Sequence, residues 1–584
     1  MRKFSYWRYL TVAITLGLIG ASILVQIVRI QNSPEVAGVI GQGAYIWKTF
    51  YPARGEIYDR NGNLLAGNKT VYEIGVDLTA LPNAKDASLK MENDIALAAQ
   101  SALGMDPADA LSRMTTAPAG AQYITLEDYV APDQADQLMT LQKNDQANPS
   151  GPNLDAVHFT AHLMRSYPEN DLASTIIGYV TRDNHGYMGV EEKYDNILAG
   201  IPVTKLVPAD PRQAVDYPQI EPGQTLILTI DREIQASVEK ILDDALVSTG
   251  AASGTIIVMD PKTGEILAMS STPRMNLNDY TQVSQIFPGE TPFNRAISEA
   301  YEPGSVAKIF TMASALDNGT IKPGTIFLDT GTIVVGGVPI HDWDNGAWGY
   351  QDMTGCLANS LNVCLAWVST KMGNNAFYSY MQRFGLGQLT GIDLAGEVPG
   401  RQKLPGDGDW TPVDLGTNAF GQGVAITPIQ MVMAASALAN NGQMVYPHVL
   451  LAEVRDGHQS DMATHIVGNP ISADTAHIIT NMLHDSLLKE SSTALLGGYS
   501  IAGKTGTAQI PTSTGYDPVN INASFIGWGP IDNPRFLVYV WLEKPQSNKA
   551  ASVVAAPIFK QVIEKLVVLM GIPPDVAVAQ TTGQ

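Results

Sequence analysis

Residues 302–308 read Glu-Pro-Gly-Ser-Val-Ala-Lys, and they put a serine and a lysine three positions apart at the head of an apolar run. On a helix, residues three apart share a face, so Lys308 is expected beside Ser305. A serine hydroxyl is a weak nucleophile until a base removes its proton. The spacing therefore predicts that Ser305 is a nucleophile and that Lys308 is its general base.

Two further motifs follow in order along the chain. Ser-Leu-Asn at residues 360–362 is the single S-x-N of the sequence, and Lys-Thr-Gly-Thr occupies residues 504–507. We expect Ser360 to relay a proton to a leaving amine and Asn362 to hold a substrate amide. A terminal carboxylate suits the substrate-binding stretch, which consists of Lys504, Thr505, Gly506 and Thr507.

The electrostatic requirements of this chemistry agree with the motifs. A buried ammonium with a second cation nearby has its pKa lowered, so Lys504 favours a neutral amine on Lys308. A carbonyl under attack also needs hydrogen-bond donors aimed at its developing negative charge. The backbone N–H groups of Ser305 and Thr507 are the candidates for those donors.

Each motif taken alone is weak, because the chain repeats two of them. S-x-x-K recurs at residues 237–240 and 486–489, and K-T-G recurs at residues 262–264. We interpret the first two as exposed helix faces and the third as a hairpin turn. Order along the chain and the flanking apolar runs separate the catalytic set from these copies.

The surrounding pattern predicts an α+β fold. Residues 225–230, 255–259, 266–269, 523–528 and 536–541 have strand character, and Asp231 is a good N-cap for an amphipathic helix. Helical stretches dominate from residue 306 to about 383, and a last helix spans roughly 553–570. These elements suggest one antiparallel sheet, covered by helices and built from both ends of the domain.

Composition excludes several classes of protein. The 584 residues carry a formal net charge of -21, which argues against a nucleic-acid partner. The two cysteines form no CxxC, and the nine histidines show no metal-ligand spacing, so we predict no metal and no cofactor.

The N-terminus predicts an anchor. Residues 9–30 are almost wholly apolar, and Arg2, Lys3 and Arg8 precede them. The run is long enough to span a bilayer, and the positive-inside rule puts residues 1–8 in the cytoplasm and the rest outside. A cleaved signal peptide is the competing reading, against which the length of the run argues. The predicted parts are a tail (1–8), a transmembrane helix (9–30), a pedestal (31–222), a catalytic domain (223–572) and a polar tail (573–584).

The three motifs resemble those of the serine acyltransferases that bind penicillin, and the wider match is to the class B penicillin-binding proteins. The stretch 54–66, Arg165 with the following Ser-Tyr-Pro, and Gly-Val-Glu at 189–191 are similar to the family's pedestal motifs. The resemblance implies a serine β-lactamase-like transpeptidase domain on an elongated α/β pedestal. It also implies a D,D-transpeptidase that cross-links peptidoglycan stem peptides and is acylated by β-lactams.

The resemblance further implies a place and a partner. The enzyme would be a single-pass protein of the bacterial cell membrane, working with a multi-span lipid II polymerase. The residues before Ser305 and after Ser360 resemble the division branch more than the elongation branch. A D,D-carboxypeptidase or β-lactamase and an inert scaffold or sensor stay open as alternatives.

The remaining candidates are interpreted as structural. Arg54, Asp59, Arg165 and Glu191 are expected to form buried charge pairs in the pedestal. Asp342 and Asp344, on either side of a tryptophan, are expected in a solvated loop.

Cys356 and Cys364 are expected as buried thiols. Along one straight helix they would lie about 12 Å apart, so a disulfide would need a bend between them.

Overall fold

The computed structural model describes residues 3–31, 45–118, 120–147, 151–208, 220–512, 515–547 and 550–575. Within these ranges the chain forms two compact units. The first comprises the residues up to 53 together with 69–164 and 200–222, and the second comprises 54–68, 165–199 and 223 onward. The predicted tail at 573–584 lies mostly outside the described residues, and the domain boundaries drawn from the sequence stay a prediction.

The first unit begins with helix α1 (Lys3–Gln31). The membrane span predicted at residues 9–30 falls on this helix. Among the described residues, however, none of the helices combines the length and the apolar character that crossing a membrane requires.

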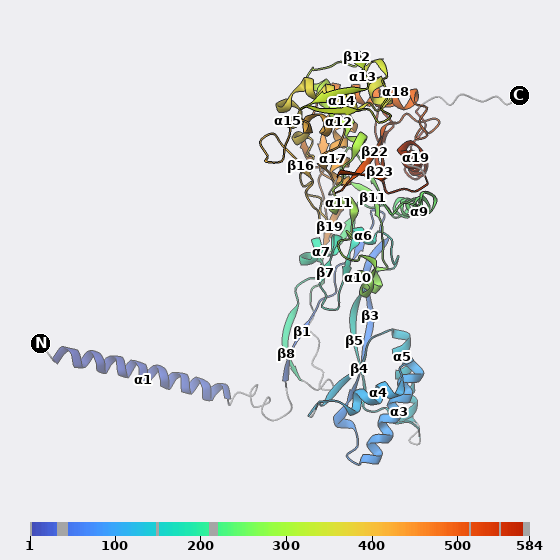
Figure 1. Cartoon of the computed structure of the whole chain (residues 1–584). Coiled ribbons are helices and arrows are strands. Elements are labelled where there is room, and N and C mark those ends of the chain that lie inside the picture. Colours follow the sequence, from blue (N-terminus) through green and yellow to red (C-terminus); the bar gives the residue numbers. More distant parts are fainter. Residues whose placement is uncertain are drawn as a thin grey trace. The chain divides into compact units, whose positions relative to one another are not determined.

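The rest of the first unit packs three helices against short strands (Figure 1). Strand β3 pairs with both β4 and β5, and β1 pairs with β8. Helix α3 ends at Gly104, whose φ of 72° suits a residue without a Cβ, and α4 begins at the capping side chain of Asp106. The elements are β1 (Tyr45–Phe50), β3 (Leu64–Asp77), η1 (Leu78–Ala80), α3 (Lys85–Leu103), α4 (Pro107–Thr115), β4 (Tyr123–Val130), α5 (Pro132–Ala147), β5 (Val157–Ser166) and β8 (Val203–Pro208).

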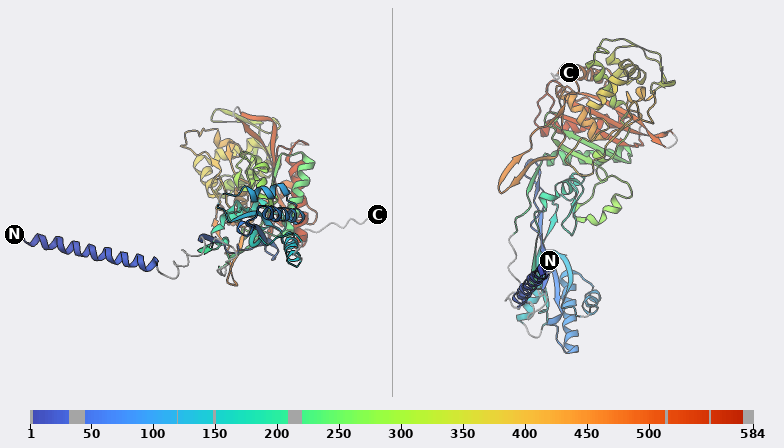
Figure 2. Two further views of the ribbon diagram at one scale, coloured as in Figure 1. Left: turned by 90° about the horizontal axis from the view of Figure 1, so that it is seen from below. Right: turned by 90° about the vertical axis from the view of Figure 1, so that its left-hand side faces the viewer.

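The second unit is built on a five-stranded antiparallel sheet in the order β11-β10-β24-β23-β22. Its strands come from both ends of the unit, as predicted: β10 (Ser253–Met259), β11 (Ile266–Ser271), β22 (Ala502–Thr512), β23 (Gly515–Gly529) and β24 (Phe536–Glu543). Figure 2 shows the green and the orange-red strands together in one layer. The predicted antiparallel sheet is therefore confirmed for residues 255–259, 266–269, 523–528 and 536–541. Residues 225–230 do not belong to it, because β9 (Thr225–Leu228) pairs with β19 (Leu450–Arg455) and β2 (Ile57–Tyr58) in another sheet.

Helices cover both faces of this sheet, because alternate residues of each strand point to opposite sides. Val538 and Val540 pack in one apolar cluster with α9 (Arg232–Thr249) and α19 (Ala551–Leu569). Tyr539 and Trp541 belong to the other cluster, with α12 (Lys308–Asp317), α14 (Asn362–Met372) and α17 (Pro428–Ala439). Figure 1 shows these helices on the two sides of β22 and β23. Asp231 caps α9 by accepting N–H groups of Glu233 and Ile234, as predicted.

The segment from residue 306 to 383 is less helical than predicted. Two small antiparallel sheets interrupt it, formed by β12 (Phe327–Asp329) with β15 (Gly349–Gln351) and by β13 (Thr332–Val335) with β14 (Val338–His341). Glycines at positive φ, including Gly331, Gly336, Gly337 and Gly349, permit the turns of these sheets. The helices of the segment are α12, α13 (Met353–Ala358), α14 and α15 (Asn374–Arg383).

The second unit also includes short elements around this core. Strand β9 pairs antiparallel with β19 and parallel with β2, and β2 pairs with the start of β3. The other elements are β2 (Ile57–Tyr58), α6 (Ser174–Ile177), β6 (Tyr179–Val180), β7 (Gly186–Tyr187), α7 (Gly189–Lys193), α8 (Asp195–Leu198), β9 (Thr225–Leu228), η3 (Leu277–Gln282), α10 (Val283–Ile286), α11 (Arg295–Ser298), η4 (Gly304–Ala307), β16 (Arg401–Gln402), α16 (Asp414–Asn418), β17 (Val424–Ala425), β18 (Met444–Val445), β19 (Leu450–Arg455), β20 (His458–Asp461), β21 (Ile466–Gly468) and α18 (Ala473–Lys489).

Candidate active site

Ser305 lies in the 3₁₀ turn η4, and Lys308 is the first residue of α12. Gly304 makes this position possible because its φ is 60°, a value that an L side chain rarely adopts. A Cβ at Gly304 would also meet the carbonyl oxygen of Thr507 at 2.9 Å. The glycine thus lets the backbone around Ser305 approach the backbone of Thr507, the two positions expected to supply oxyanion donors.

Lys308 is fully buried, and among the residues that the structure describes its ammonium nitrogen hydrogen-bonds only to neutral oxygen atoms. Its Nζ donates to the backbone oxygen of Ser360 at 2.5 Å, to Ser360 Oγ at 3.2 Å and to Asn362 Oδ1 at 2.8 Å. Burial, then the charge of Lys504, hold the pKa of Lys308 well below its ordinary value, and the charge of Asp342 opposes them. This is the direction that general-base chemistry requires.

The S-x-N motif lies in a sharp turn between α13 and α14. Ser360 adopts a positive φ of 53°, uncommon outside glycine, asparagine and aspartate. Cys356 and Cys364 form a disulfide across this turn, with their Cα atoms 6.2 Å apart. The bend required for a disulfide is therefore present, and the expectation of two separate buried thiols is wrong.

The Lys-Thr-Gly-Thr motif opens strand β22 at the edge of the sheet. Gly506 is required there because a Cβ would meet Val306 Cγ1 at 2.8 Å and Ser524 Oγ at 2.5 Å. Lys504 is buried, with its Nζ 3.2 Å from Thr505 Oγ1. Burial lowers the pKa of Lys504, and the charge of Glu490 raises it. Neither Glu490 nor its effect was predicted from the sequence.

One cleft of about 880 Å³ brings the motifs together. Ser305, Ser360, Asn362, Thr505 and Thr507 all line it. Lys308, Lys504 and Gly506 do not line the cleft, and all three are buried. Among the described residues, the hydroxyl of Ser305 has no hydrogen-bond partner, so it is free to meet a ligand in the cleft.

The second copies of the motifs lie elsewhere. Lys240 on α9 is exposed and pairs with Asp244, and Lys489 on α18 is half exposed. Lys262 is exposed in the turn between β10 and β11. The copies lie on two helices and a turn, as predicted, but the helix face at residues 486–489 is only partly exposed because Ser486 is buried.

The expectation that Asp342 lies in a solvated loop is wrong. Asp344 is exposed, as expected of a solvated loop, but Asp342 is only 3% exposed and lines the cleft. Burial, followed by the charge of Asp329 and a hydrogen bond with it, raises the pKa of Asp342 to about 6. The local Asp-Trp-Asp pattern does not distinguish the two aspartates, because their burial depends on residues far away in sequence.

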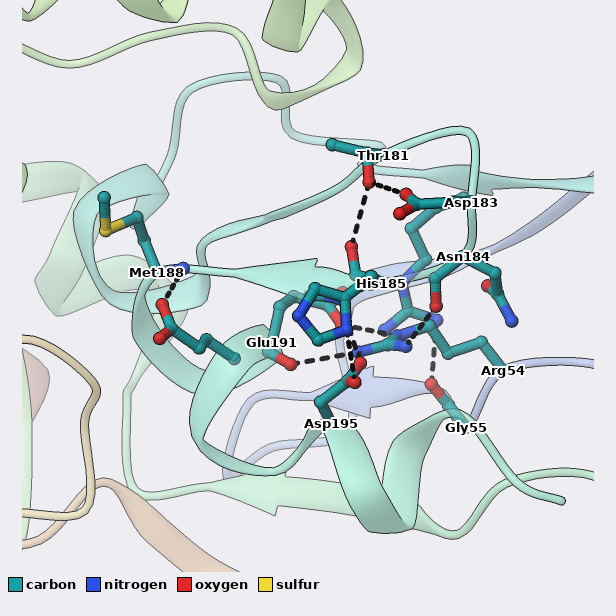
Figure 3. Close-up of polar contacts among 12 residues, drawn as sticks. Arg54, Gly55, Thr181, Asp183, Asn184, His185, Met188, Glu191 and Asp195 are labelled. Carbon is teal, nitrogen blue, oxygen red and sulfur yellow. Dashed lines mark hydrogen bonds and ion pairs between the residues drawn. The ribbon is translucent and has the colours of Figure 1, made fainter.

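The charged residues predicted to be structural form a separate cluster (Figure 3). Glu191 accepts a hydrogen bond from Arg54 Nε and another from Arg165 Nε, both at 2.7 Å, and all three side chains are buried. Asp195 approaches Arg54 Nη2 at 2.7 Å. The predicted buried charge pairs are confirmed for these residues.

Asp59 was expected in the same kind of pair and differs. Its carboxylate accepts the backbone N–H groups of Asn61, Asn63 and Arg232 rather than a charged side chain. Asp59 therefore holds a turn by hydrogen bonds to the backbone.

Two protein families match the chain. Residues 254–564 match the penicillin-binding protein transpeptidase domain, and residues 49–215 match the penicillin-binding protein dimerisation domain. The stage V sporulation protein D of Bacillus subtilis is 32% identical over 543 residues, covering 90% of this chain and 79% of that protein. The peptidoglycan D,D-transpeptidase FtsI of Escherichia coli is 29% identical over 542 residues, covering 91% and 85%.

Solved structures share the fold. Penicillin-binding protein 2X from Streptococcus thermophilus superposes with a TM-score of 0.75 at 22% identity, covering 92% of this chain and 82% of that one. Penicillin-binding protein 3 from Mycobacterium tuberculosis, complexed with aztreonam, gives a TM-score of 0.68 at 24% identity, covering 91% and 99%.

Proposed function

We propose a function on the premise that this chain belongs to the penicillin-binding proteins with a transpeptidase domain. The protein is a serine D,D-transpeptidase that cross-links the stem peptides of peptidoglycan and is acylated by β-lactams. One observation supports this most directly: beside the cleft that holds Ser305, a buried lysine amine contacts only neutral oxygens of the S-x-N turn.

In the acylation step that we propose, Lys308 is the base and Ser305 is the nucleophile. Lys308 in its neutral form takes the proton of Ser305, and Ser305 Oγ attacks the carbonyl carbon of the penultimate D-Ala. The backbone N–H groups of Ser305 and Thr507 stabilise the developing oxyanion. The C–N bond then breaks, and terminal D-Ala leaves after its amine receives a proton through Ser360.

The other polar groups of the cleft hold the donor peptide. Asn362 holds a substrate amide, and Lys504 with the hydroxyls of Thr505 and Thr507 holds the terminal carboxylate. In the second step an amine of a neighbouring strand attacks the acyl-enzyme, forms the cross-link and regenerates Ser305.

Covalent labelling tests this proposal. A fluorescent penicillin is expected to label the wild-type protein and to leave Ser305→Ala unlabelled. A matched control is Ser237→Ala, which alters the first serine of a second S-x-x-K on α9 and should label normally. Labelling of Ser305→Ala at the wild-type rate would refute the assignment. Rapid release of the acyl group to water without an amine acceptor would indicate a hydrolase instead.

The cellular role that we propose is septal wall synthesis at the bacterial cell membrane. The apolar run at residues 9–30 supports attachment as a single-pass anchor with the catalytic domain outside, and the family supports a multi-span lipid II polymerase as partner. Depletion followed by microscopy tests the role, since filaments indicate division and round cells indicate elongation. Extraction of the full chain by carbonate, without detergent, would contradict the anchor.

A further inference from the structure

Three consecutive residues beside the cleft hold the S-x-N turn from outside. The backbone oxygen of His341 accepts from Asn362 Nδ2 at 3.2 Å, and Asp342 Oδ1 accepts from the N–H of Val363 at 3.0 Å. Trp343 Nε1 donates to the backbone oxygen of Asn359 at 3.1 Å. The segment 341–343 therefore contacts the turn before, within and after the motif.

The contact of Asp342 has a specific physical meaning. Helix α14 starts at Asn362, and its N-cap residue Leu361 has no side chain that can cap the helix. The first N–H groups of a helix need acceptors, and a carboxylate also interacts favourably with the helix dipole. Asp342 supplies this cap from the end of the β13–β14 hairpin, with its Oδ1 on the N–H of Val363.

The other carboxylate oxygen of Asp342 faces a second acid. Asp342 Oδ2 is buried, and among the described residues no N–H or hydroxyl donor reaches it. Asp329 lies close enough to raise the pKa of Asp342, and it accepts the backbone N–H groups of Gly331 and Trp348 through its own two oxygens. The pair thus ties two loops to the start of α14.

We propose that Asp342 is a positioning residue for acylation, which holds the S-x-N turn, and through it Lys308, in the geometry that serves Ser305. The proposal rests on the transpeptidase function and deepens it. Asn362 and Ser360 are the groups that bind the amine of Lys308, and Asp342 caps the helix that carries Asn362. A shift at this cap is therefore transmitted to the general base by two hydrogen-bonded contacts.

Two substitutions separate the cap from the charge. Asp342→Asn keeps an oxygen for the N–H of Val363 and gains an amide N–H for Asp329, but carries no charge. Asp342→Ala removes both contacts. Asp344→Ala is the matched control, because this neighbouring aspartate is exposed and bonds only locally, to the N–H of Gly346.

The measurement is the rate of acylation by a fluorescent penicillin, resolved into binding and chemical steps. Asp342→Ala is expected to slow the chemical step about 10- to 100-fold with less effect on binding, the loss typical of a misplaced catalytic group. Asp342→Asn is expected within about threefold of wild type, since asparagine and aspartate cap helices about equally well.

The pH profile provides a readout that a purely structural role would not move. The groups that act on Lys308 are Lys504, which lowers its pKa, and Asp342, which raises it; Asp329 acts on Asp342, and Glu490 acts on Lys504. Removing the charge of Asp342 lowers the pKa of Lys308 further. The acid limb of the acylation profile should therefore move to lower pH in both variants, while the plateau falls only in Asp342→Ala.

Two results would overturn the proposal. One is an Asp342→Ala plateau within twofold of wild type, and the other is a folded Asp342→Asn as slow as Asp342→Ala. If Asp342→Ala does not fold, the pH profile of the acylation rate of Asp342→Asn tests the proposal. A wild-type plateau with an acid limb shifted to lower pH supports the proposal, and an unshifted acid limb refutes it. Ser305→Ala and wild type run alongside, so an unlabelled wild type would count against the transpeptidase function itself.

Discussion

Two regions of the second unit bury cations, and they do so in opposite ways. In the cluster of Arg54, Arg165 and Glu191, both guanidinium groups bond to one carboxylate at 2.7 Å. Figure 3 shows Arg54 with Glu191 and Asp195. Beside the cleft, Lys308 is equally buried, but it bonds to a hydroxyl, an amide oxygen and a backbone oxygen. The first arrangement keeps its charge, and the second favours losing it.

The pKa values of Arg54 and Lys308 shift in opposite directions for this reason. Burial alone would lower the pKa of Arg54, but the charge of Glu191 and hydrogen bonds with Asp195 and Glu191 raise it above its ordinary value. Burial and Lys504 together lower the pKa of Lys308. A buried cation that is matched by a carboxylate serves structure, whereas a buried amine without one is prepared to act as a base.

Replacing Lys308 is expected to have the largest effect on the difference between the two regions. Lys308→Ala should reduce the rate of penicillin acylation about 10²- to 10⁴-fold, the usual contribution of a general base. The free energy of unfolding should not fall comparably, since the variant removes an unmatched buried amine. Lys240→Ala is the control, because this lysine ends the S-x-x-K of α9 and its side chain is 75% exposed. An acylation rate near wild type in Lys308→Ala would contradict the role of base.

The ion cluster should show the reverse pattern. Glu191→Ala removes the carboxylate that Arg165 binds and leaves Arg54 with Asp195 alone, and it is expected to cost about 3–5 kcal/mol of unfolding free energy. Urea denaturation of the folded protein measures it, with the exposed neighbour Glu192→Ala as control. A loss below about 1 kcal/mol would mean that water or rearrangement replaces Glu191.

A disulfide stabilises the S-x-N turn beside the cleft, whereas ion pairs stabilise the cluster around Glu191. The Cys356–Cys364 disulfide closes a ring with a sequence separation of 8 around the S-x-N turn. Replacing both cysteines by serine should lower the unfolding free energy by about 2–3 kcal/mol, the loop-closure value for so small a ring. Denaturation with and without reductant measures the loss. An unchanged midpoint in the double variant would show that the turn does not depend on the brace.

The smallest expected effect is the pH dependence of the two regions: acylation should depend on pH through Lys308, whereas the stability from the Arg54 cluster should not. Below its folded pKa, Lys308 is an ammonium and cannot accept a proton, so acylation should rise with pH along a limb well below the ordinary lysine range. The raised pKa of Arg54 has the opposite sign: the stability it contributes is fully present below its unfolded pKa. The stability difference between wild type and Glu191→Ala should therefore stay constant from about pH 6 to about pH 9. A difference that varies with pH over that range would contradict the fully charged cluster.

Much of the fold could be predicted because its signals are local. Continuous runs of apolar residues mark β10, β11 and β24, whose residues are almost all buried, and Asp231 caps α9 through N–H groups two and three residues away. The sequence analysis did not predict the two small sheets β12–β15 and β13–β14. Their strands are only three or four residues long, too short for a period of two to stand out from helical surroundings.

The sequence by itself identified Ser305 as the candidate nucleophile, because the order of three motifs and the apolar context of η4 are properties of the chain. The sequence did not determine whether Asp342 is buried or whether the two cysteines form a disulfide. Asp342 is buried through Asp329 and the N-terminus of α14, and Cys356 reaches Cys364 only because Ser360 turns the chain at a positive φ. These outcomes depend on packing between distant segments, whose burial and electrostatics no local pattern encodes.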